Sequence, residues 1–391
     1  MRSKTREAGT AHGIVLLLSA VMPIMAITSL IPILPLLLRE FADVPGSSAL
    51  VPIALTIPAL CVALFSPLAG WLCDRLGRKK LLVGALAFYS VFGFLPWFLT
   101  DLGAIIASRV LLGVVEAVIM TVSTALIGDY FEGERRQRWI AIQVAVSSVA
   151  ATVLIAVGGL LGDALGTRGP FLLYLCSLLI ALAAMLILHE PQRPTRLSPA
   201  GEPQKSALAI VLPLALITFG VGFAFYTIFV QIGPILEEAG AVTAGMIGLA
   251  GAIVNLGMVC GAVIFRKFAD IAAPPLLSIG LCLAATGYLG VALSSAFVPI
   301  TAFATVVCLG IGILLPNMLA WTLRSLPLEV RGRGLGIWTG AFFLGQFVSP
   351  LFVAATAPIL GGLSLVIGGI GLLIAVAALF SLPAMKRSSP T

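Results

Sequence analysis

Long apolar runs alternate with short polar gaps along nearly all of the 391 residues. About twelve runs are long enough to cross the ~30 Å hydrocarbon core of a bilayer, which takes a helix of roughly 20 residues. The predicted spans cover residues 13–38, 49–72, 80–100, 103–130, 138–163, 170–189, 207–236, 243–267, 274–294, 299–323, 334–357 and 361–383. The pattern predicts an all-α membrane protein with twelve transmembrane helices.

Basic residues are confined to every second gap between these spans. Twenty of the 23 lysines and arginines lie at the N-terminus or after an even-numbered span, and the opposite gaps hold only Arg39 and Arg168. Positively charged loops stay in the cytoplasm. We therefore expect a multi-pass protein of the bacterial inner (plasma) membrane with both termini cytoplasmic.

Composition excludes several other classes of protein. A chain with 60% hydrophobic and 10% charged residues is not a soluble domain. The net charge of +7 is dispersed over the predicted cytoplasmic loops, so attraction to anionic lipid headgroups explains it and no nucleic-acid partner is expected. The six cysteines lie within or at the ends of spans, without the paired spacing of a metal site. No metal is therefore expected.

The longest polar interval lies midway along the chain. Residues 190–206 are rich in proline and charge and read as a cytoplasmic linker between a bundle over 1–189 and a bundle over 207–391. The pattern Glu-x-Arg-x-Arg opens span five at Glu134 and span eleven at Glu329. This echo indicates an internal duplication into two pseudo-symmetric six-helix bundles, which is typical of secondary transporters.

A glycine-rich basic motif follows span two. The chain reads Gly70-Trp-Leu-Cys-Asp74-Arg75-Leu-Gly77-Arg78-Lys79-Lys80. This segment closely resembles the loop signature of the major facilitator superfamily. The resemblance implies a charge cluster that latches the two bundles in the outward-facing state and breaks when the cytoplasmic side opens. The alternative is a purely topological role, in which a basic loop holds span two in place.

Each position of this motif has an expected physical role. Gly70 would let a neighbouring helix approach closely. Gly77 would allow a sharp turn. Arg78 can reach back to Asp74 or across to a second acid, for which Asp129 at the end of span four is the best candidate.

Three further segments resemble this family, the first of them the superfamily as a whole and the other two its twelve-span drug/proton antiporter branch. They are Arg109-Val-Leu-Leu-Gly113, the run from Gly158 to Gly162, and Gly340 to Pro350. One position departs from that branch. Leu154-Ile155 stands where the branch carries a Gly-Pro pair that bends the helix and is associated with exchange.

Only two charges lie near the middle of a span, where a charge costs roughly 2.5–3.5 kcal/mol. Arg109 and Glu116 are two helical turns apart, about 10.5 Å, so they share a face without touching. Gly113 lies between them and leaves room for substrate, water or a neighbouring helix. Our hypothesis is that Glu116 carries the coupling proton and that Arg109 assists it or steers anions. The alternative is a fixed hydrogen-bond network with polar groups of spans one and five.

Neutral polar residues fall on the helices that line the central cavity in superfamily members. The candidates are Thr28, Gln143, Ser147, Tyr226, Asn255, Asn317, Trp338 and Gln346. Each one alone is as consistent with interhelical packing. Together they describe a largely apolar, aromatic cavity with one acid and one base. Such a cavity suits an amphipathic organic molecule better than a sugar.

The sequence lacks the motifs of an ATP-driven pump, a membrane enzyme or a channel. The sequence has no phosphate-binding loop for ATP, no convergent catalytic groups and no charged rings of a channel filter. We expect a secondary active transporter that exports amphipathic drugs or small organic metabolites in exchange for protons. The alternative is a proton-coupled importer or an uncoupled facilitator of a small organic anion. No cofactor is expected because the proton gradient supplies the energy. The expected partners are a small-molecule substrate, protons and membrane lipid, and the chain is expected to be a monomer.

Overall fold

The computed structural model describes residues 8–191, 205–240, 242–268, 273–326 and 331–387, without the side chains of Asp74 and residues 205–210, 331–333 and 382–387. In these residues every regular element is helical. The first half holds α1 (Thr10–Thr28), η1 (Ile31–Ile33), α2 (Leu34–Glu40), α3 (Ser47–Leu76), α4 (Arg78–Phe94), η2 (Leu95–Trp97), α5 (Leu102–Tyr130), α6 (Gly133–Leu165), η3 (Gly166–Leu175) and α7 (Cys176–Ile187). The second half holds α8 (Lys205–Ala239), α9 (Ala244–Lys267), α10 (Ala273–Ala292), α11 (Phe297–Ser325), α12 (Arg331–Leu360) and α13 (Leu363–Arg387).

The predicted membrane-spanning fold is confirmed. Within the described ranges, 11 helical stretches are long and apolar enough to cross a membrane, and one of them, Gly133–Ile187, runs over 55 residues. That stretch contains α6, then η3 and α7, with a turn at Gly166, whose φ of +66° favours glycine. It therefore crosses twice, and the chain makes twelve passes.

Proline interrupts two spans that the sequence predicts as continuous. The first span breaks into α1, η1 and α2, with Pro32 and Pro35 at the starts of the last two elements. The sixth begins as a ten-residue 3₁₀ helix that contains Pro170, so its α-helical part has only 12 residues. Proline lacks the amide hydrogen that a helix interior needs. These breaks free backbone carbonyls inside the protein.

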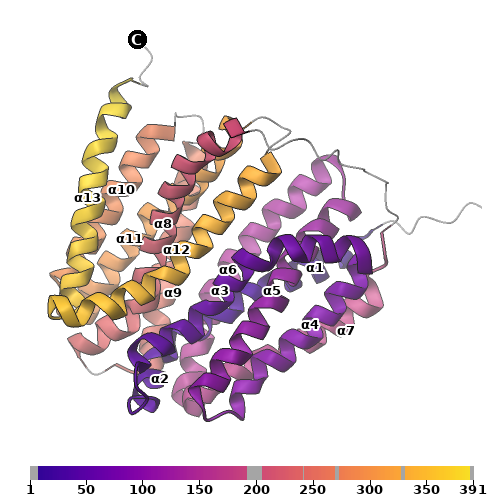
Figure 1. The fold of residues 1–391 in the computed structure, drawn as a ribbon, viewed down its shortest axis with the longest axis horizontal. Helices are drawn as coiled ribbons and strands as arrows, with labels where there is room; N and C mark the ends of the chain where they lie inside the picture. The colour runs from indigo at the N-terminus through magenta and orange to yellow at the C-terminus, as the bar shows by residue number, and fades with distance from the viewer. Residues whose placement is uncertain (1–7, 192–204, 241, 269–272, 327–330, 388–391) are drawn as a thin grey trace, which may run out of the picture.

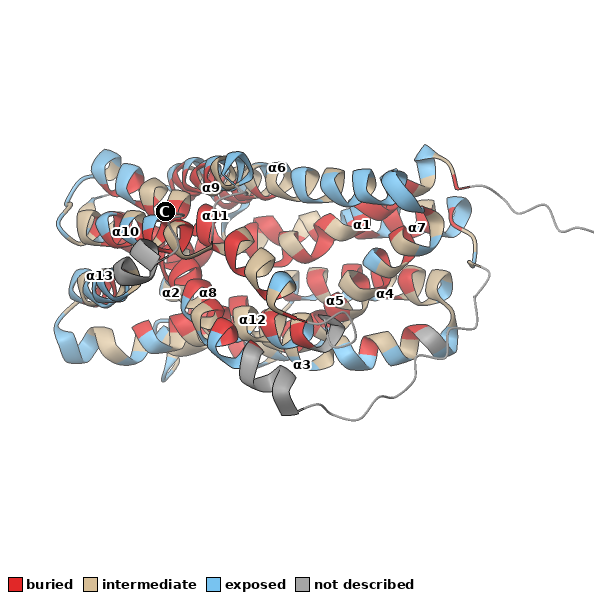
Figure 2. Cartoon of the chain, turned by 90° about the horizontal axis from the view of Figure 1, so that it is seen from above, coloured by how far each residue is buried: buried red, intermediate tan, exposed pale blue. Residues whose placement is uncertain are grey.

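The helices form two groups that lie side by side. Figure 1 shows α1 to α7 on one side and α8 to α13 on the other, with α3 beside α12 and α6 beside α9 between them. Buried residues concentrate in the interior and exposed ones on the outer faces (Figure 2). Large apolar side chains such as Leu179, Leu186 and Phe380 are exposed. An apolar exterior of this kind faces lipid in a membrane protein.

A buried tyrosine makes the same contact in each half. Tyr89 of α4 donates a hydrogen bond to the carbonyl of Met22 in α1, and Tyr288 of α10 donates one to the carbonyl of Ala224 in α8. Both side chains are fully buried. The third span of each half is thus tied to its first span by a matched contact, as a duplicated architecture requires.

The halves touch closely at the end of the molecule that carries α2, here called the α2 end. A Cβ at Gly159 of α6 would lie 3.0 Å from Gly248 Cα of α9, and a Cβ at Gly248 would lie 2.9 Å from the Ile155 carbonyl oxygen. Gly251 and Ala244 extend this contact along α9. Small residues let the two backbones meet, which is how helices pack tightly inside membranes.

Two polar contacts reinforce the closure of the α2 end. Arg39, in the last turn of α2, pairs with Glu237 at the end of α8. The Thr243 hydroxyl, which caps α9, donates to Asp163 of α6 over 2.9 Å. The molecule is therefore fastened at the α2 end. The opposite end, where the loops carry most of the basic residues, is called the basic end.

The glycine contact yields a test with a matched control. Gly159→Ala should destabilise the protein by about 1–3 kcal/mol because the added methyl overfills the α6–α9 contact. Gly84→Ala in α4 is the control, since a Cβ there meets nothing within 4 Å. Alanine at that helical position should be neutral or slightly stabilising. Thermal unfolding midpoints in one detergent measure both, and equal shifts for the two variants would contradict the close contact.

Candidate proton and substrate site

Arg109 lies fully buried in α5, and each of its three nitrogens donates a hydrogen bond. Its Nε donates to the Ala54 carbonyl over 3.3 Å and its Nη1 to the Tyr174 hydroxyl over 2.8 Å. Its Nη2 donates to the Ala26 carbonyl. None of the polar side chains Thr28, Gln143 and Ser147 of spans one and five accepts these bonds.

Two acceptors of Arg109 are backbone carbonyls without a helical partner, one because of a proline and one because it lies at a helix end. Ala54 would normally accept a bond from the residue four positions on, but that residue is Pro58, which has no amide hydrogen. Ala26 lies in the last turn of α1, where carbonyls lack helical partners. The guanidinium group donates a hydrogen bond to each of these two carbonyls. This geometry defines Arg109 as a brace between α1, α3 and η3.

Two tyrosines complete this network and were missed from the sequence. Tyr174 of η3 donates a second bond to the Ala26 carbonyl over 3.0 Å, and its ring lies 5.4 Å from that of Tyr89. A signal was available, because the chain has only five tyrosines and a buried hydroxyl needs a partner. Four of the five have 4% exposure or less, so they bond internally or face a polar group.

Glu116 lies two turns from Arg109 toward the basic end and is 2% exposed. Its Oε2 atom has no hydrogen-bond partner among the described residues. No ion pair joins it to Arg109 there, in agreement with the spacing. The carboxyl group acts electrostatically on Cys61 of α3 and on Tyr226 of α8, in the other half. Glu116 is therefore a buried acid that faces the junction of the halves.

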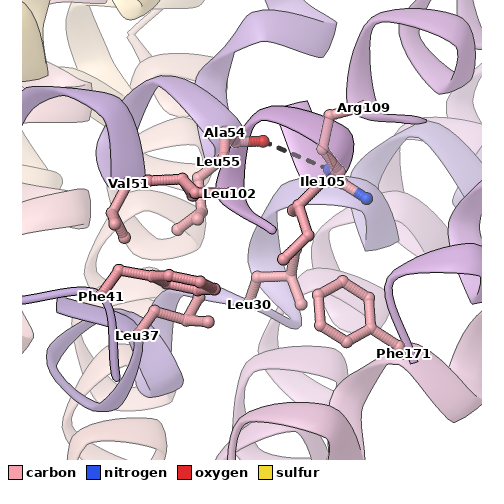
Figure 3. A pocket seen from close by; sticks show the side chains of 10 residues that line it. All are labelled: Leu30, Leu37, Phe41, Val51, Ala54, Leu55, Leu102, Ile105, Arg109 and Phe171. Carbon is pink, nitrogen blue, oxygen red and sulfur yellow. Dashed lines mark hydrogen bonds between the residues drawn. The ribbon is translucent and has the colours of Figure 1, made fainter. Parts of the chain in front are cut away.

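Gly113 brings α5 against α3. A Cβ at this position would lie 2.6 Å from Pro58 Cα and 2.7 Å from Cys61 Cβ. Of the three occupants expected beside Gly113, the structure therefore has the neighbouring helix. A small apolar pocket lies on the other side of Arg109, between the turn that follows α1 and the elements α2, α3, α5 and η3, as Figure 3 shows. It is lined by Leu30, Leu37, Phe41, Val51, Ala54, Leu55, Leu102, Ile105, Arg109 and Phe171.

Three of the neutral candidates make side-chain hydrogen bonds, one within its own helix and two between helices. The Thr28 hydroxyl bonds the Ile24 carbonyl of its own helix over 2.8 Å. The Asn317 amide bonds the Ala273 carbonyl at the start of α10 over 2.9 Å. The Asn255 amide crosses between the halves to Thr152 Oγ1 of α6 over 2.8 Å. These donors are engaged within the protein.

Among the other neutral candidates, buried polar atoms lack hydrogen-bond partners in the described structure. Trp338 and Gln346 of α12 are buried, and in the described structure the Trp338 Nε1 and Gln346 Oε1 atoms have no partner. Tyr226 of α8 is also buried. Gln143 and Ser147 are half-buried on α6 and make no side-chain hydrogen bond in the same described ranges. Unpaired buried polar atoms are costly unless a ligand or water completes them.

The gate segment, residues 70–80, folds as the motif suggests at its turn. Gly77 has φ +89° and separates α3 from α4. Arg78 pairs with Asp129 at the end of α5 and also contacts the Ala125 carbonyl over 3.3 Å. Both partners belong to the first half. Glu190, which follows α7, accepts hydrogen bonds from the backbone amides of Arg78 and Lys79. This contact was not predicted from the sequence.

The start of the gate segment differs from expectation. A Cβ at Gly70 would meet nothing within 4 Å, so the close helix approach expected there was wrong for this structure. The face of α3 at Gly70 is open, with no neighbouring helix in contact. Arg75 lies over the Trp71 ring, 4.1 Å from its centroid. The side chain of Asp74 lies outside the described part of the chain.

Twelve helical passes in two groups, with a buried acid at their junction, define a multi-pass membrane transporter. The family model of the Major Facilitator Superfamily matches residues 16–241 and 214–391. The chain belongs to this superfamily, and it is a transporter rather than an enzyme.

Several of the curated relatives are drug-resistance proteins. The chain is 27% identical to the class H tetracycline resistance protein of Pasteurella multocida over 46% of its length, and 30% identical to multidrug resistance protein 1 of Bacillus subtilis over 46%. Each match covers 45% of the relative, so the chain spans about half the length of the curated relatives it matches. These distant homologues belong to the drug/proton antiporter branch.

Solved structures share the fold over almost the whole chain. A bacterial homologue of the human lysosomal transporter Spinster, in an inward-facing and unoccupied conformation, superposes with a TM-score of 0.77 and 16% identity, covering 98% of this chain and 100% of that one. An auto-inhibited peptide transporter of the POT family gives 0.74 and 12% identity, covering 97% and 98%. At such identities the likeness establishes the fold alone.

Proposed function

We propose that the chain exports amphipathic drugs or small organic metabolites across the bacterial inner membrane in exchange for protons, by alternating access. The observation that carries the proposal is the buried Glu116 carboxyl group with an unpartnered oxygen. An ionised carboxylate there has no counter-charge in contact, so a proton or a cationic group of the substrate must neutralise it. The drug-resistance activity named for the relatives supports the same direction of transport.

In this proposal Arg109 braces the first half instead of exchanging protons. Its three bonds occupy the guanidinium group on the side of α1, α3 and η3. It also stays positively charged at all relevant pH values. Arg109 therefore supports the α5 backbone from which Glu116 projects, and its positive charge adds a constant field to the site.

The substrate would lie between Glu116 and the aromatic wall of the second half. Tyr226, Trp338 and Gln346 supply polar atoms, and the Trp338 ring stacks on Phe342 with centroids 6.3 Å apart. Gln143 and Ser147 extend the proposed cavity toward the basic end. Asn255 and Asn317 support its walls through the interhelical bonds described above, and Thr28 lies at the end of α1 with its hydroxyl bonded within that helix.

We place the basic end in the cytoplasm because its loops carry the positive charge. The closed α2 end would then face the periplasm, and the structure would be open to the cytoplasm. In the opposite state, the cluster of Gly70, Asp74, Arg75, Gly77, Arg78 and Asp129 would engage the second half and close the basic end. Arg78–Asp129 would keep this cluster assembled within the first half between those events.

A dye-efflux assay tests the proposal. Cells that express the chain should extrude a cationic aromatic dye while the proton gradient is intact, and extrusion should stop when an uncoupler collapses that gradient. Vector-only cells and a fixed external pH are the controls. Extrusion that is unchanged after collapse would contradict proton exchange.

One observation favours the alternative of an importer or an uncoupled facilitator. α6 runs unbroken over 33 residues, with Leu154 and Ile155 where the antiporter branch carries the bending Gly-Pro pair. An uncoupled facilitator would move substrate in both directions, following its concentration alone. The occupied donors of Arg109 leave less for binding an anion, so we rank this function second.

A further inference from the structure

The start of α4 is capped by a residue from the far end of the first half. The first amides of a helix have no helical partners, and the residue at the cap position, Gly77, has no side chain to satisfy them. The Glu190 carboxylate accepts from the Arg78 amide and, over 3.1 Å, from the Lys79 amide. A Cβ at Gly77 would lie 3.1 Å from that carboxyl group, so glycine is what lets Glu190 approach.

A cluster of His12, Tyr130 and His189, called the His–Tyr cluster, holds the chain just before Glu190. The Tyr130 hydroxyl donates to the His189 carbonyl and accepts from the His189 amide over 3.1 Å. The His12 Nε2 and His189 Nδ1 atoms are 3.2 Å apart, and the Tyr130 and His189 ring centroids are 4.8 Å apart. Three helices, α1, α5 and α7, therefore fix the backbone that presents Glu190.

The geometry of the two imidazoles depends on protonation. His12 Nδ1 accepts from the Gly9 amide over 3.2 Å, so neutral His12 carries its hydrogen on Nε2 and donates it to His189 Nδ1. If His189 Nδ1 were protonated, it and His12 Nε2 would both be donors, and the hydrogen bond between them would break. Imidazoles exchange protons between pH 5 and 8, unlike the other ordinary side chains.

The charged groups around this cluster come from each neighbouring element. Glu190 and Asp129 act electrostatically on Tyr130. Arg78 of α4 pairs with Asp129, and Arg135 of α6 donates to the Ala8 carbonyl over 3.1 Å. The two acids favour an added proton on the imidazoles and the two arginines oppose it, so the opposing charges partly offset one another.

We propose that Glu190 is a positioning residue for the gate segment and that the His–Tyr cluster weakens its hold when the cytoplasm is acidified. Glu190 also marks the point where the first half passes toward the second. The hydrogen bonds from Arg78 and Lys79 to Glu190 therefore link the turn at Gly77 to the point where the chain leaves the first half. Loss of the cap would loosen the start of α4 and slow closure of the basic end. The link to transport rests on the proposed function, whereas the cap itself does not.

Hydrogen exchange of the purified full-length chain tests the cap directly. The peptide that contains Arg78 and Lys79 should exchange about tenfold faster in Glu190→Ala than in the wild type, because two charge-assisted bonds are lost. Glu190→Gln should restore part of the protection, since its amide oxygen still accepts one bond. Glu132→Ala is the matched control, because that acid at the start of α6 makes no capping bond. Equal exchange in Glu190→Ala and the wild type would overturn the proposal.

The pH dependence is tested on the same peptide at pH 8 and pH 6, after correction for intrinsic chemical exchange. Wild-type protection should fall at pH 6, and His189→Phe should remove this difference while keeping an aromatic ring against Tyr130. A pH difference that persists in His189→Phe would refute the role of the cluster. In transport, Glu190→Ala should lower the maximal rate without changing KM for the dye, and a changed KM with an unchanged rate would also count against the proposal. Because exchange is read without any substrate, a failure of the proposed function leaves this test intact.

Discussion

Glu116→Gln is expected to abolish gradient-driven accumulation of substrate while leaving exchange of substrate across the membrane intact. Glutamine has nearly the size of a protonated glutamate but cannot release a proton, so the carrier can still alternate without coupling. One pH unit can drive about a tenfold concentration ratio per proton exchanged. Inverted vesicles with an imposed pH gradient should approach this ratio with the wild type and reach about one with the variant.

The control for this prediction keeps the acid and moves it. Glu116→Asp retains a carboxyl group one methylene closer to α5, so it should couple less efficiently without losing coupling. Substrate counterflow, measured without a gradient, checks that both variants are folded and bind substrate. Wild-type accumulation by Glu116→Gln would show that another group carries the proton.

Arg109→Ala is expected to produce the largest loss of stability among single substitutions in the first half. It removes the donor to the Ala54 carbonyl and to the Tyr174 hydroxyl, and leaves the Ala26 carbonyl with only the bond from Tyr174. Charge-assisted bonds contribute about 1.5–3 kcal/mol each in soluble proteins and interhelical bonds in membranes average about 0.6 kcal/mol, so three bonds give roughly 2–9 kcal/mol. A much lower unfolding midpoint in detergent should reveal this loss.

Two companion variants separate geometry from charge at this position. Arg109→Lys keeps the charge but cannot reach three acceptors in the planar fork of a guanidinium, so it should recover only part of the stability. Arg138→Ala removes an exposed arginine of α6 and should leave the midpoint unchanged. If Arg109→Ala unfolds at the wild-type temperature yet loses transport, the residue acts on substrate or proton and the brace is wrong.

The membrane fold could be predicted from sequence because its two determinants are local. A run of about 20 apolar residues marks a span, and flanking basic residues mark a loop. The breaks at Pro32 and Pro170 were less visible, since proline can either bend a helix or end it. The family could be inferred from the segment between Gly70 and Lys80, because glycine, acid and base recur there at fixed spacing.

The partners within the site could not be predicted in the same way. Arg109 finds a carbonyl freed by Pro58 and another at the end of α1, and only the packing of three elements brings these together. Glu190 reaches the gate segment across 112 positions. The open surroundings of Gly70 depend on which end of the molecule is closed. The sequence of a carrier is the same in all its conformational states, whereas a contact between two residues forms only in some of these states.

Proton movement during substrate transport tests the central claim most directly. Proteoliposomes containing the wild-type chain and a trapped pH indicator should show a pH change when substrate is added to one side, and Glu116→Gln should show none while it still exchanges labelled substrate. Substrate movement by the wild type without any accompanying proton flux would contradict the account.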